Sequence, residues 1–352
     1  MSCFGGSGSN QVSRMPYRVL LCLFILPISL SAGPRHAFEH QAADSQVAGA
    51  PAPPQGAQPI RIATNLVQVP VSVTDRAGSP VKNLQKDDFR IEENGAAVNI
   101  EHMGEPGETR LDMVLVFDVT GSTRARFDFE QLAATHFLKT VFRPKDEVAI
   151  LTIASAPTVV LGRTTVLATA LEGLGQLKPS GAATPFYDSV IAAARILRIL
   201  PDPETRRVQI VLSDGEDNRS EHPLADAMKE VQQADCIFYS INPGGQSIRL
   251  NKVSLRGQQG MEALATQTGG SAFLADRMED LEQIYGRIAS ELQAQYLLSY
   301  YSPDPRMDGS FRSIVVRVPQ KPELRVRSRQ GYYSAAGTNS SLTPDKPAQP
   351  IR

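Results

Sequence analysis

The sequence lacks several features that would point to a particular class of protein. It contains no tryptophan and only three cysteines, and its formal net charge is −1 over 352 residues. Two cysteines fall in the first 32 residues, so Cys236 stands alone in the rest of the chain and has no partner for an internal disulfide. We expect a buried structural thiol there, because the surrounding run is apolar. The missing basic excess excludes a nucleic-acid-binding surface and a polybasic membrane patch.

The apolar run near the N-terminus is too short to span a bilayer comfortably. Arg14 and Arg18 precede the run Val19–Leu30, and small residues follow at 31–33. This order is typical of a secretory signal peptide. We therefore expect residues 1–32 to be a signal peptide and the protein to be exported, either periplasmic or secreted, with no membrane insertion after cleavage. N-terminal sequencing of the native protein should then start near residue 33, whereas an uncleaved membrane anchor is the alternative.

The remaining chain divides by composition into a central segment with two flanks and two loose ends. Residues 33–58 are rich in Ala, Pro, Gly and Gln and are predicted to form a disordered linker, and residues 335–352 a disordered tail. Both flanks, 60–103 and 296–334, show the period-two alternation of strands. Each flank has too few strands to bury two faces, so we expect them to pack together as one β-sandwich-like domain. Two separate small β modules are the alternative.

Two short patterns in the N-terminal flank indicate that it forms strands. Four valines alternate with other residues from Val67 to Val73, which is typical of a strand with one buried face. Asn94-Gly95 follows the strand candidate that begins at Phe89, and this dipeptide is a strong signal for a tight hairpin turn.

The central segment, residues 111–292, alternates apolar runs of strand length with helical patterns. This alternation predicts an α/β domain, Rossmann-like and doubly wound, with a mostly parallel six-stranded sheet and helices on both faces. Apolar spacing predicts three helices in particular, around 129–141, 187–197 and 281–292. The strand candidates are Leu111–Phe117, Glu147–Ala154, Thr158–Gly162, Val208–Leu212, Cys236–Ile241 and Ser271–Leu274.

Polar residues cluster where the predicted strands end. Asp118, Thr120 and Ser122 follow the first strand of the central segment, Asp214 follows the fourth strand, and Thr184 lies in a loop just before a helix. In open parallel sheets, ligands bind at the carboxyl ends of the strands. Carboxylates and hydroxyls are hard oxygen ligands, which suit Mg²⁺, or Mn²⁺ or Ca²⁺, rather than zinc. The sequence therefore predicts a divalent-cation site at this edge.

The pattern Asp118-Val-Thr-Gly-Ser122, a distant Thr184, and Asp214 before a glycine resembles the metal-ion-dependent adhesion site of von Willebrand factor type A domains. That family's pattern has serine where Thr120 stands, so this chain keeps the hydroxyl and adds a methyl group. The resemblance covers residues 111–292. It implies a type A fold and a metal site that a partner completes with an Asp or Glu carboxylate.

The flanks resemble a narrower group of exported bacterial type A proteins, best represented in Acidobacteria. The segments that carry this likeness are Val69–Asp75, Asp87–Gly95 and Gly331–Tyr333.

The same residues allow other interpretations. Asp118 or Asp214 alone would fit a helix cap. A metal-dependent phosphatase-like enzyme would need a second carboxylate where Thr120 stands, and no histidine is placed to serve as a base for Ser122. We therefore expect a non-catalytic, divalent-metal-dependent protein-binding module of the adhesion type. The main alternative is a structural or assembly scaffold in which the metal only stabilises the fold.

Overall fold

The structure is a computed structural model, and several parts of the chain lie outside the residues that it describes. These parts include the predicted signal peptide, the predicted linker, Ser122 and the predicted tail beyond residue 335. Among the helices that are described, none combines the length and the apolar character needed to cross a membrane. The described residues are 66–104, 106–120, 124–180, 183–199, 205–245, 252–277 and 279–335.

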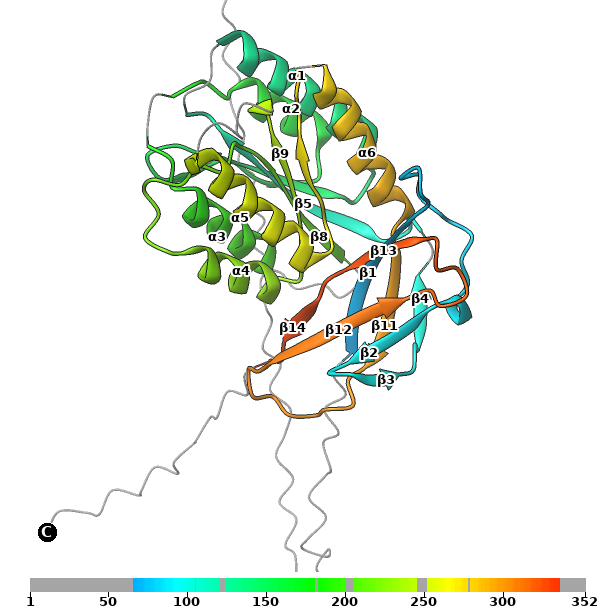
Figure 1. The fold of residues 1–352 in the computed structure, drawn as a ribbon. Helices are drawn as coiled ribbons and strands as arrows, with labels where there is room; N and C mark the ends of the chain where they lie inside the picture. The colour runs from blue at the N-terminus through cyan, green and yellow to red at the C-terminus, as the bar shows by residue number, and fades with distance from the viewer. Residues whose placement is uncertain are drawn as a thin grey trace, which may run out of the picture. The chain divides into compact units, whose positions relative to one another are not determined.

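A six-stranded sheet lies between the helices of the central segment (Figure 1). Its strand order is β10-β9-β8-β5-β6-β7, and every neighbouring pair is parallel except the antiparallel pair β6–β7. This confirms the predicted mostly parallel sheet of six strands. The strands are β5 (Arg110–Asp118), β6 (Glu147–Ile153), β7 (Pro157–Thr164), β8 (Thr205–Leu212), β9 (Cys236–Asn242) and β10 (Ala272–Leu274).

Helices cover both faces of this sheet, as the sequence predicts. Strand β5 shows the cause, because its side chains alternate between the two faces. Met113, Leu115 and Phe117 join the core under α1, α2 and α6, whereas Val114 and Val116 join the core under α3, α4 and α5. The helices are α1 (Arg124–Val141), α2 (Leu167–Gly175), α3 (Phe186–Arg198), α4 (Leu224–Gln233), α5 (Lys252–Thr268) and α6 (Asp280–Ala294).

Apolar spacing predicts α1, α3 and α6 but not the other three helices. Helix α5 shows why, since its buried face includes Ser254, Gly257, Gln258 and Gly260. Because small and polar residues occupy these positions, the sequence lacks the apolar 3.6-residue repeat that would indicate a buried helix face.

The two flanks fold together into two four-stranded antiparallel sheets, β13-β1-β11-β4 and β14-β12-β2-β3. Strand β1 pairs with β11 and β13, and β2 pairs with β12, so each sheet combines both flanks. One apolar core, which includes Val69, Ile91, Tyr300 and Ile314, joins the two sheets and confirms the β-sandwich. The elements are β1 (Leu66–Thr74), η1 (Lys86–Asp88), β2 (Arg90–Glu93), β3 (Ala96–Val98), β4 (His102–Gly104), β11 (Tyr296–Tyr301), β12 (Phe311–Arg317), β13 (Arg325–Ser328) and β14 (Gly331–Tyr333).

The β2–β3 connection is the two-residue turn predicted from Asn94-Gly95. Both residues have positive φ, 49° and 80°. Two positive φ values are what a type I′ hairpin turn requires.

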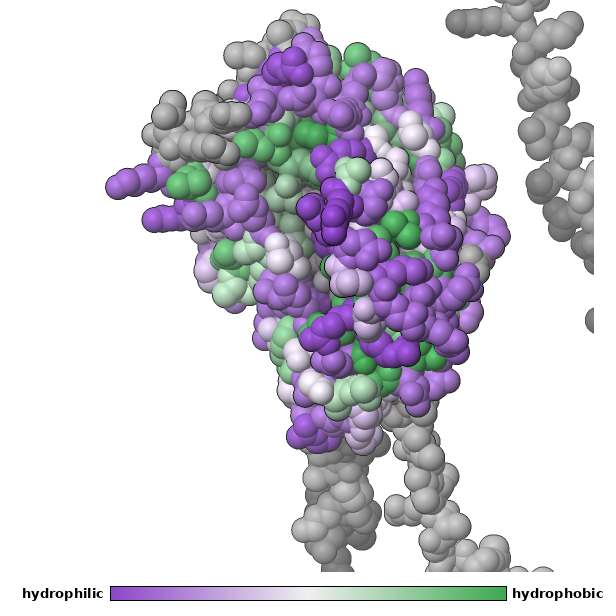
Figure 2. Space-filling view, turned by 45° about the vertical axis from the view of Figure 1, so that its right-hand side comes forward, coloured by the Kyte–Doolittle hydropathy of each residue, from purple (hydrophilic) through white to green (hydrophobic). Residues whose placement is uncertain are grey.

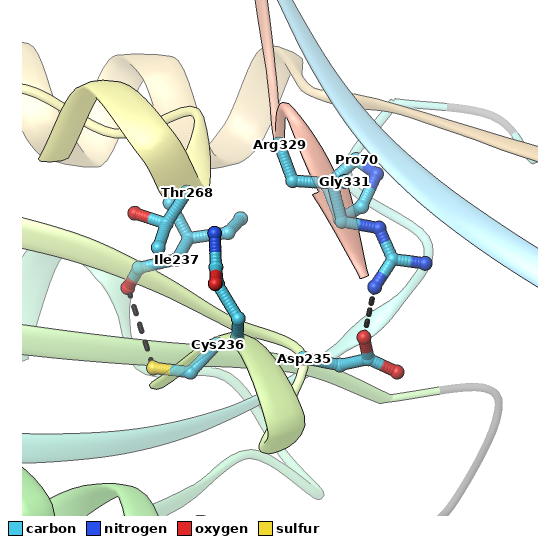
Figure 3. Close-up of a pocket in the computed structure, with 8 residues that line it drawn as sticks. Pro70, Asp235, Cys236, Ile237, Thr268, Arg329 and Gly331 are labelled. Carbon is cyan, nitrogen blue, oxygen red and sulfur yellow. Dashed lines mark hydrogen bonds and ion pairs between the residues drawn. The ribbon is translucent and has the colours of Figure 1, made fainter. Parts of the chain in front are cut away.

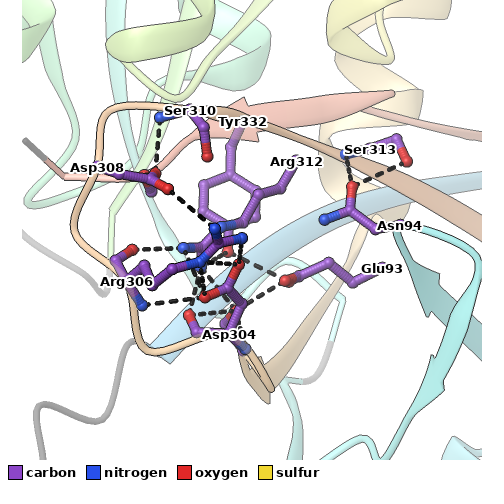
Figure 4. A network of polar contacts seen from close by, with 11 residues as sticks. Glu93, Asn94, Asp304, Arg306, Asp308, Ser310, Arg312, Ser313 and Tyr332 are labelled. Carbon is purple, nitrogen blue, oxygen red and sulfur yellow. Dashed lines mark hydrogen bonds and ion pairs between the residues drawn. The ribbon is translucent and has the colours of Figure 1, made fainter.

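A buried polar network lies inside the sandwich (Figure 4). Glu93 accepts hydrogen bonds from the hydroxyls of Tyr300, at 2.7 Å, and Tyr332, at 3.2 Å. Arg312, which is only 1% exposed, lies near the same Tyr332 hydroxyl and donates to the carbonyl of Asp304 at 2.6 Å. The Glu93 carboxylate and the Arg312 guanidinium therefore share the Tyr332 hydroxyl as a partner. Such hydrogen bonds offset part of the cost of burying the two charges.

The connection between β13 and β14 meets the residue that precedes β9 (Figure 3). Arg329 forms an ion pair with Asp235, the residue before β9. The neighbouring Cys236 is 4% exposed, and burial raises the pKa of its thiol. A buried thiol of raised pKa fits the predicted structural cysteine.

Candidate metal site

Strand β5 ends at Asp118, whose carboxylate lies at the edge of the sheet among hydroxyl groups. The Thr120 hydroxyl donates to Asp118 Oδ1 at 2.5 Å, and the Thr120 backbone N–H donates to the same oxygen at 3.0 Å. The Ser213 hydroxyl, at the end of the neighbouring strand β8, donates to Asp118 Oδ2 at 2.7 Å. Both carboxylate oxygens are therefore held in fixed positions by hydrogen bonds from two adjacent strand ends.

Thr184 joins this cluster from a loop distant in sequence. Its Oγ1 lies 2.9 Å from the Thr120 hydroxyl, and the Thr184 side chain is buried. The two loops run side by side, because the Ser180 N–H donates to the carbonyl of Val119 at 2.6 Å. The structure thus brings together Asp118, Thr120 and Thr184, three of the residues predicted from the sequence.

Asp214 lies beside this cluster without touching it directly. It follows Ser213, and its Oδ1 accepts the N–H of Glu216 at 3.0 Å. Among the described residues, no hydrogen bond joins Asp214 to Asp118, Thr120 or Thr184. The next residue, Gly215, has φ +74°, and a Cβ there would meet the carbonyl oxygen of Gly257 in α5 at 2.8 Å. Only glycine therefore allows this loop to turn so close to α5.

Two residues that the sequence did not single out hold the segment that carries Thr184. The Asn218 side chain accepts the Thr184 N–H at 2.9 Å, and the Asn218 N–H donates to the Thr184 carbonyl at 3.1 Å. Asp217 accepts the N–H of Phe186, the first residue of α3, at 2.9 Å. No local pattern points to these residues, because each hydrogen bond joins segments about thirty residues apart. Ser213 was missed for the same reason.

The electrostatics of the cluster disfavour two ionised carboxylates. Burial raises the pKa of Asp118, hydrogen bonds from Thr120 and Ser213 lower it, and the nearby charge of Asp214 raises it further. Burial likewise raises the pKa of Asp214, with Arg126 acting in the opposite direction from a distance. Within the described residues no ion pair reaches either aspartate. Ionisation of both is therefore favoured by additional positive charge at the site.

The donor set fits a hard divalent cation. A hydroxyl that donates its proton to Asp118 still has lone pairs to offer a metal ion, so Thr120 and Thr184 can serve as ligands in the arrangement seen. Across the part of the chain that the structure describes, no three side chains of His, Cys, Asp or Glu gather in one place. A set of two carboxylates and several hydroxyls suits Mg²⁺, which keeps several waters and takes one or two carboxylates. Ser122, the fifth candidate, lies outside the described residues.

Comparison with known proteins bears on this region directly. Residues 113–216 match the family model described as von Willebrand factor type A domain. The chain contains a type A domain. The matched range runs from the middle of β5 past Asp214, so it includes all five candidate residues. None of the curated protein sequences matches the chain.

Several solved structures overlap with about half of the chain. The conserved hypothetical protein BatB from Bacteroides thetaiotaomicron is 15% identical, with a TM-score of 0.42, over 51% of this chain and 98% of that chain. An aerotolerance-related membrane protein from Bacteroides fragilis is 16% identical, with a TM-score of 0.40, over 52% and 98%. Proximal thread matrix protein 1 from the mussel byssus, with a zinc-occupied MIDAS motif, is 17% identical, with a TM-score of 0.46, over 58% and 50%.

Proposed function

We propose that the type A domain binds one divalent cation and, through it, a protein partner. The ligands are Asp118, Thr120, Ser122, Thr184 and Asp214, either directly or through water. Mg²⁺ is the preferred ion, with Mn²⁺ or Ca²⁺ as substitutes. The observation that carries this proposal is the geometry of Thr120, whose hydroxyl lies 2.5 Å from Asp118 and 2.9 Å from Thr184 at the carboxyl edge of the sheet.

The cation would supply the positive charge that Asp118 and Asp214 lack, and the partner would supply a carboxylate from Asp or Glu. Such a contact is a charge-assisted interaction in a site that the protein fills only in part. Ser213 holds the carboxylate of Asp118 in place, and Asn218 holds Thr184 in place. Among the described members of this set, no group is arranged as a base or a nucleophile, and we propose binding without catalysis. An exported location is part of the proposal and depends on the N-terminal apolar run alone.

Calorimetric titration with Mg²⁺ and Mn²⁺ tests the ligand assignment. The wild-type protein should bind one equivalent, and Asp118→Ala should weaken binding by at least about tenfold because it removes an anionic ligand. Asp112→Asn is a matched control, since Asp112 is also a buried aspartate of β5 but lies at its other end. Unchanged binding in Asp118→Ala would refute the assignment, and equal losses in both variants would indicate a general effect on the strand.

A chelator experiment separates a binding role from the scaffold alternative. Protein is crosslinked to its native partners, or used in a pull-down, with Mg²⁺ or with EDTA, and its melting is recorded under both conditions. We expect partner capture to be lost with EDTA while the melting temperature changes little. A large fall in melting temperature would instead favour a structural metal, because an ion bound only to the native state stabilises that state.

A further inference from the structure

A second candidate site lies far along the chain from the metal-site residues, beside helix α6. A cleft of about 770 Å³ opens between α6, β10, β13 and the turn that follows β1. This volume is within the range of roughly 300–1,000 Å³ that is usual for ligand sites. Figure 2 turns the right-hand side of Figure 1 forward, and hydrophilic residues dominate the face that it shows. Three arginines line the cleft, Arg287, Arg325 and Arg327, against a single carboxylate, Glu291.

Regular spacing in two elements directs these side chains to the cleft. On α6 the lining residues Gln283, Arg287 and Ser290 recur at helical spacing, while the face with Ile284 and Ile288 is buried in the core. On β13 two arginines, Arg325 and Arg327, alternate with Val326, which packs against the sandwich core. Each element therefore divides into an apolar side and a side that faces the cleft.

One of the three arginines is already neutralised. Arg327 forms an ion pair with Glu291 and donates to the carbonyl of Gly270 at 3.0 Å. Glu291 also accepts the hydroxyls of Ser72, at 2.9 Å, and Tyr239, at 2.8 Å. This pair is thus a rigid part of the wall and has little capacity left for a ligand.

The other two arginines, Arg287 and Arg325, are exposed. The Arg287 guanidinium lies over the ring of Phe273, 5.2 Å from its centroid, which fixes the direction of its fork. Among the described residues, neither Arg287 nor Arg325 has a carboxylate within ion-pair distance. The cleft therefore presents two uncompensated positive charges, together with the hydroxyls of Ser79 and Ser290.

We infer that this cleft binds a ligand with two carboxylates, one for Arg287 and one for Arg325. A guanidinium presents two parallel N–H donors that match the two oxygens of a carboxylate, and the serine hydroxyls supply further donors. The carboxylates can come from a free dicarboxylic acid or from Asp and Glu side chains of an acidic peptide. None of the lining residues belongs to the proposed metal site, so this inference does not depend on the proposed function.

Titration calorimetry of the full exported chain in metal-free buffer tests the site with three probes: glutarate, a hexaglutamate peptide and inorganic phosphate. The double variant Arg287→Gln/Arg325→Gln should bind the carboxylate probes at least about tenfold more weakly than the wild type. The control Arg195→Gln/Arg198→Gln removes the same charge from two exposed arginines of α3 and should bind as the wild type does. All four arginines are exposed, so melting curves should stay close to that of the wild type.

The probes distinguish the two sources of carboxylate. Tighter binding of hexaglutamate indicates an acidic peptide, and tighter binding of glutarate indicates a free acid; either result supports the site. The inference is overturned if neither probe binds, if the control loses as much affinity as the cleft variant, or if phosphate binds more tightly than both. Neither varied arginine belongs to the proposed metal site, so the cleft variant should bind Mg²⁺ as the wild type does, which separates a failure here from a failure of the metal proposal.

Discussion

Strand β5 carries a buried aspartate near each end, and the two aspartates have different partners. Asp112 is 1% exposed and Asp118 is 8% exposed. At the start of the strand, Arg163 Nη2 lies 2.7 Å from Asp112 Oδ2 as an ion pair. At the end of the strand, the described residues that meet Asp118 contribute only hydroxyls and a backbone N–H. Within the described residues, the protein thus supplies an ion-pair partner to Asp112 but none to Asp118.

This difference separates a structural carboxylate from a candidate ligand. Asp112 has its counter-ion but, within the described residues, neither of its oxygens accepts a hydrogen bond of normal geometry. Burial therefore raises its pKa to about 6, although Arg163 acts in the opposite direction. Asp118 has the reverse arrangement, with oriented donors and no counter-ion. Oriented oxygens without a counter-ion are what a metal site presents before its ion arrives.

The largest expected effect comes from removing the cation that the protein supplies. Arg163→Met should lower the free energy of unfolding by about 3 kcal/mol at pH 7, because the buried Asp112 loses its ion-pair partner and Glu147 loses the same guanidinium. Urea denaturation measures this loss, and Asp112→Asn in the same background should recover most of it. The control Arg195→Met breaks an exposed pair with Glu230 and should cost under about 1 kcal/mol. A cost no larger than in that control would show that Arg163 does not serve Asp112.

The second-largest expected effect is the contribution of Asp112 to the pH dependence of stability. Its pKa in the folded protein, about 6, lies above the ordinary value, so the folded state prefers the protonated form. Its contribution to stability is therefore full below about pH 4 and is lost as pH rises through 6. One pKa unit corresponds to about 1.4 kcal/mol, which makes the total on the order of 3 kcal/mol. Asp112→Asn should gain stability relative to the wild type across this window in urea titrations, and a difference that stays constant from pH 4 to 8 would contradict it.

The sequence predicted the parts of the fold that depend on local period. Alternating valines in β1, the Asn94-Gly95 turn and the apolar runs of the central sheet each leave a pattern within ten residues. Helix α5 leaves none, because Gly257 and Gln258 stand on its buried face. Positions of Asp118, Thr120 and Thr184 were predicted because parallel strands end at one edge. Ser213 and Asn218 act through hydrogen bonds that join distant segments, and such contacts exist only after folding.

The arginine cleft was unpredictable for the same reason. Its lining comes from the turn near residue 78, from β10 and α6, and from β13, which are separated by up to 250 residues. Taken alone, each segment shows only arginines or serines of the kind that any protein surface carries. The domain boundaries that we predict from composition remain a prediction.

The smallest expected effect tests whether the hydroxyl end of β5 depends on its supporting loop. Asn218 holds Thr184 through both its side chain and its backbone, and Asn218→Ala removes only the side-chain bond of 2.9 Å. A residue that orients a ligand without touching the ion is expected to matter by about tenfold in metal affinity. Calorimetry with Mg²⁺ should show that loss, while urea denaturation without metal should change by less than about 1 kcal/mol because Asn218 is exposed. Arg219→Ala is the matched control, an exposed neighbour with no contact to the Thr184 loop among the described residues. Equal affinities for the two variants and the wild type would mean that Thr184 needs no such support, and would leave the two ends of β5 less different than the hydrogen bonds indicate.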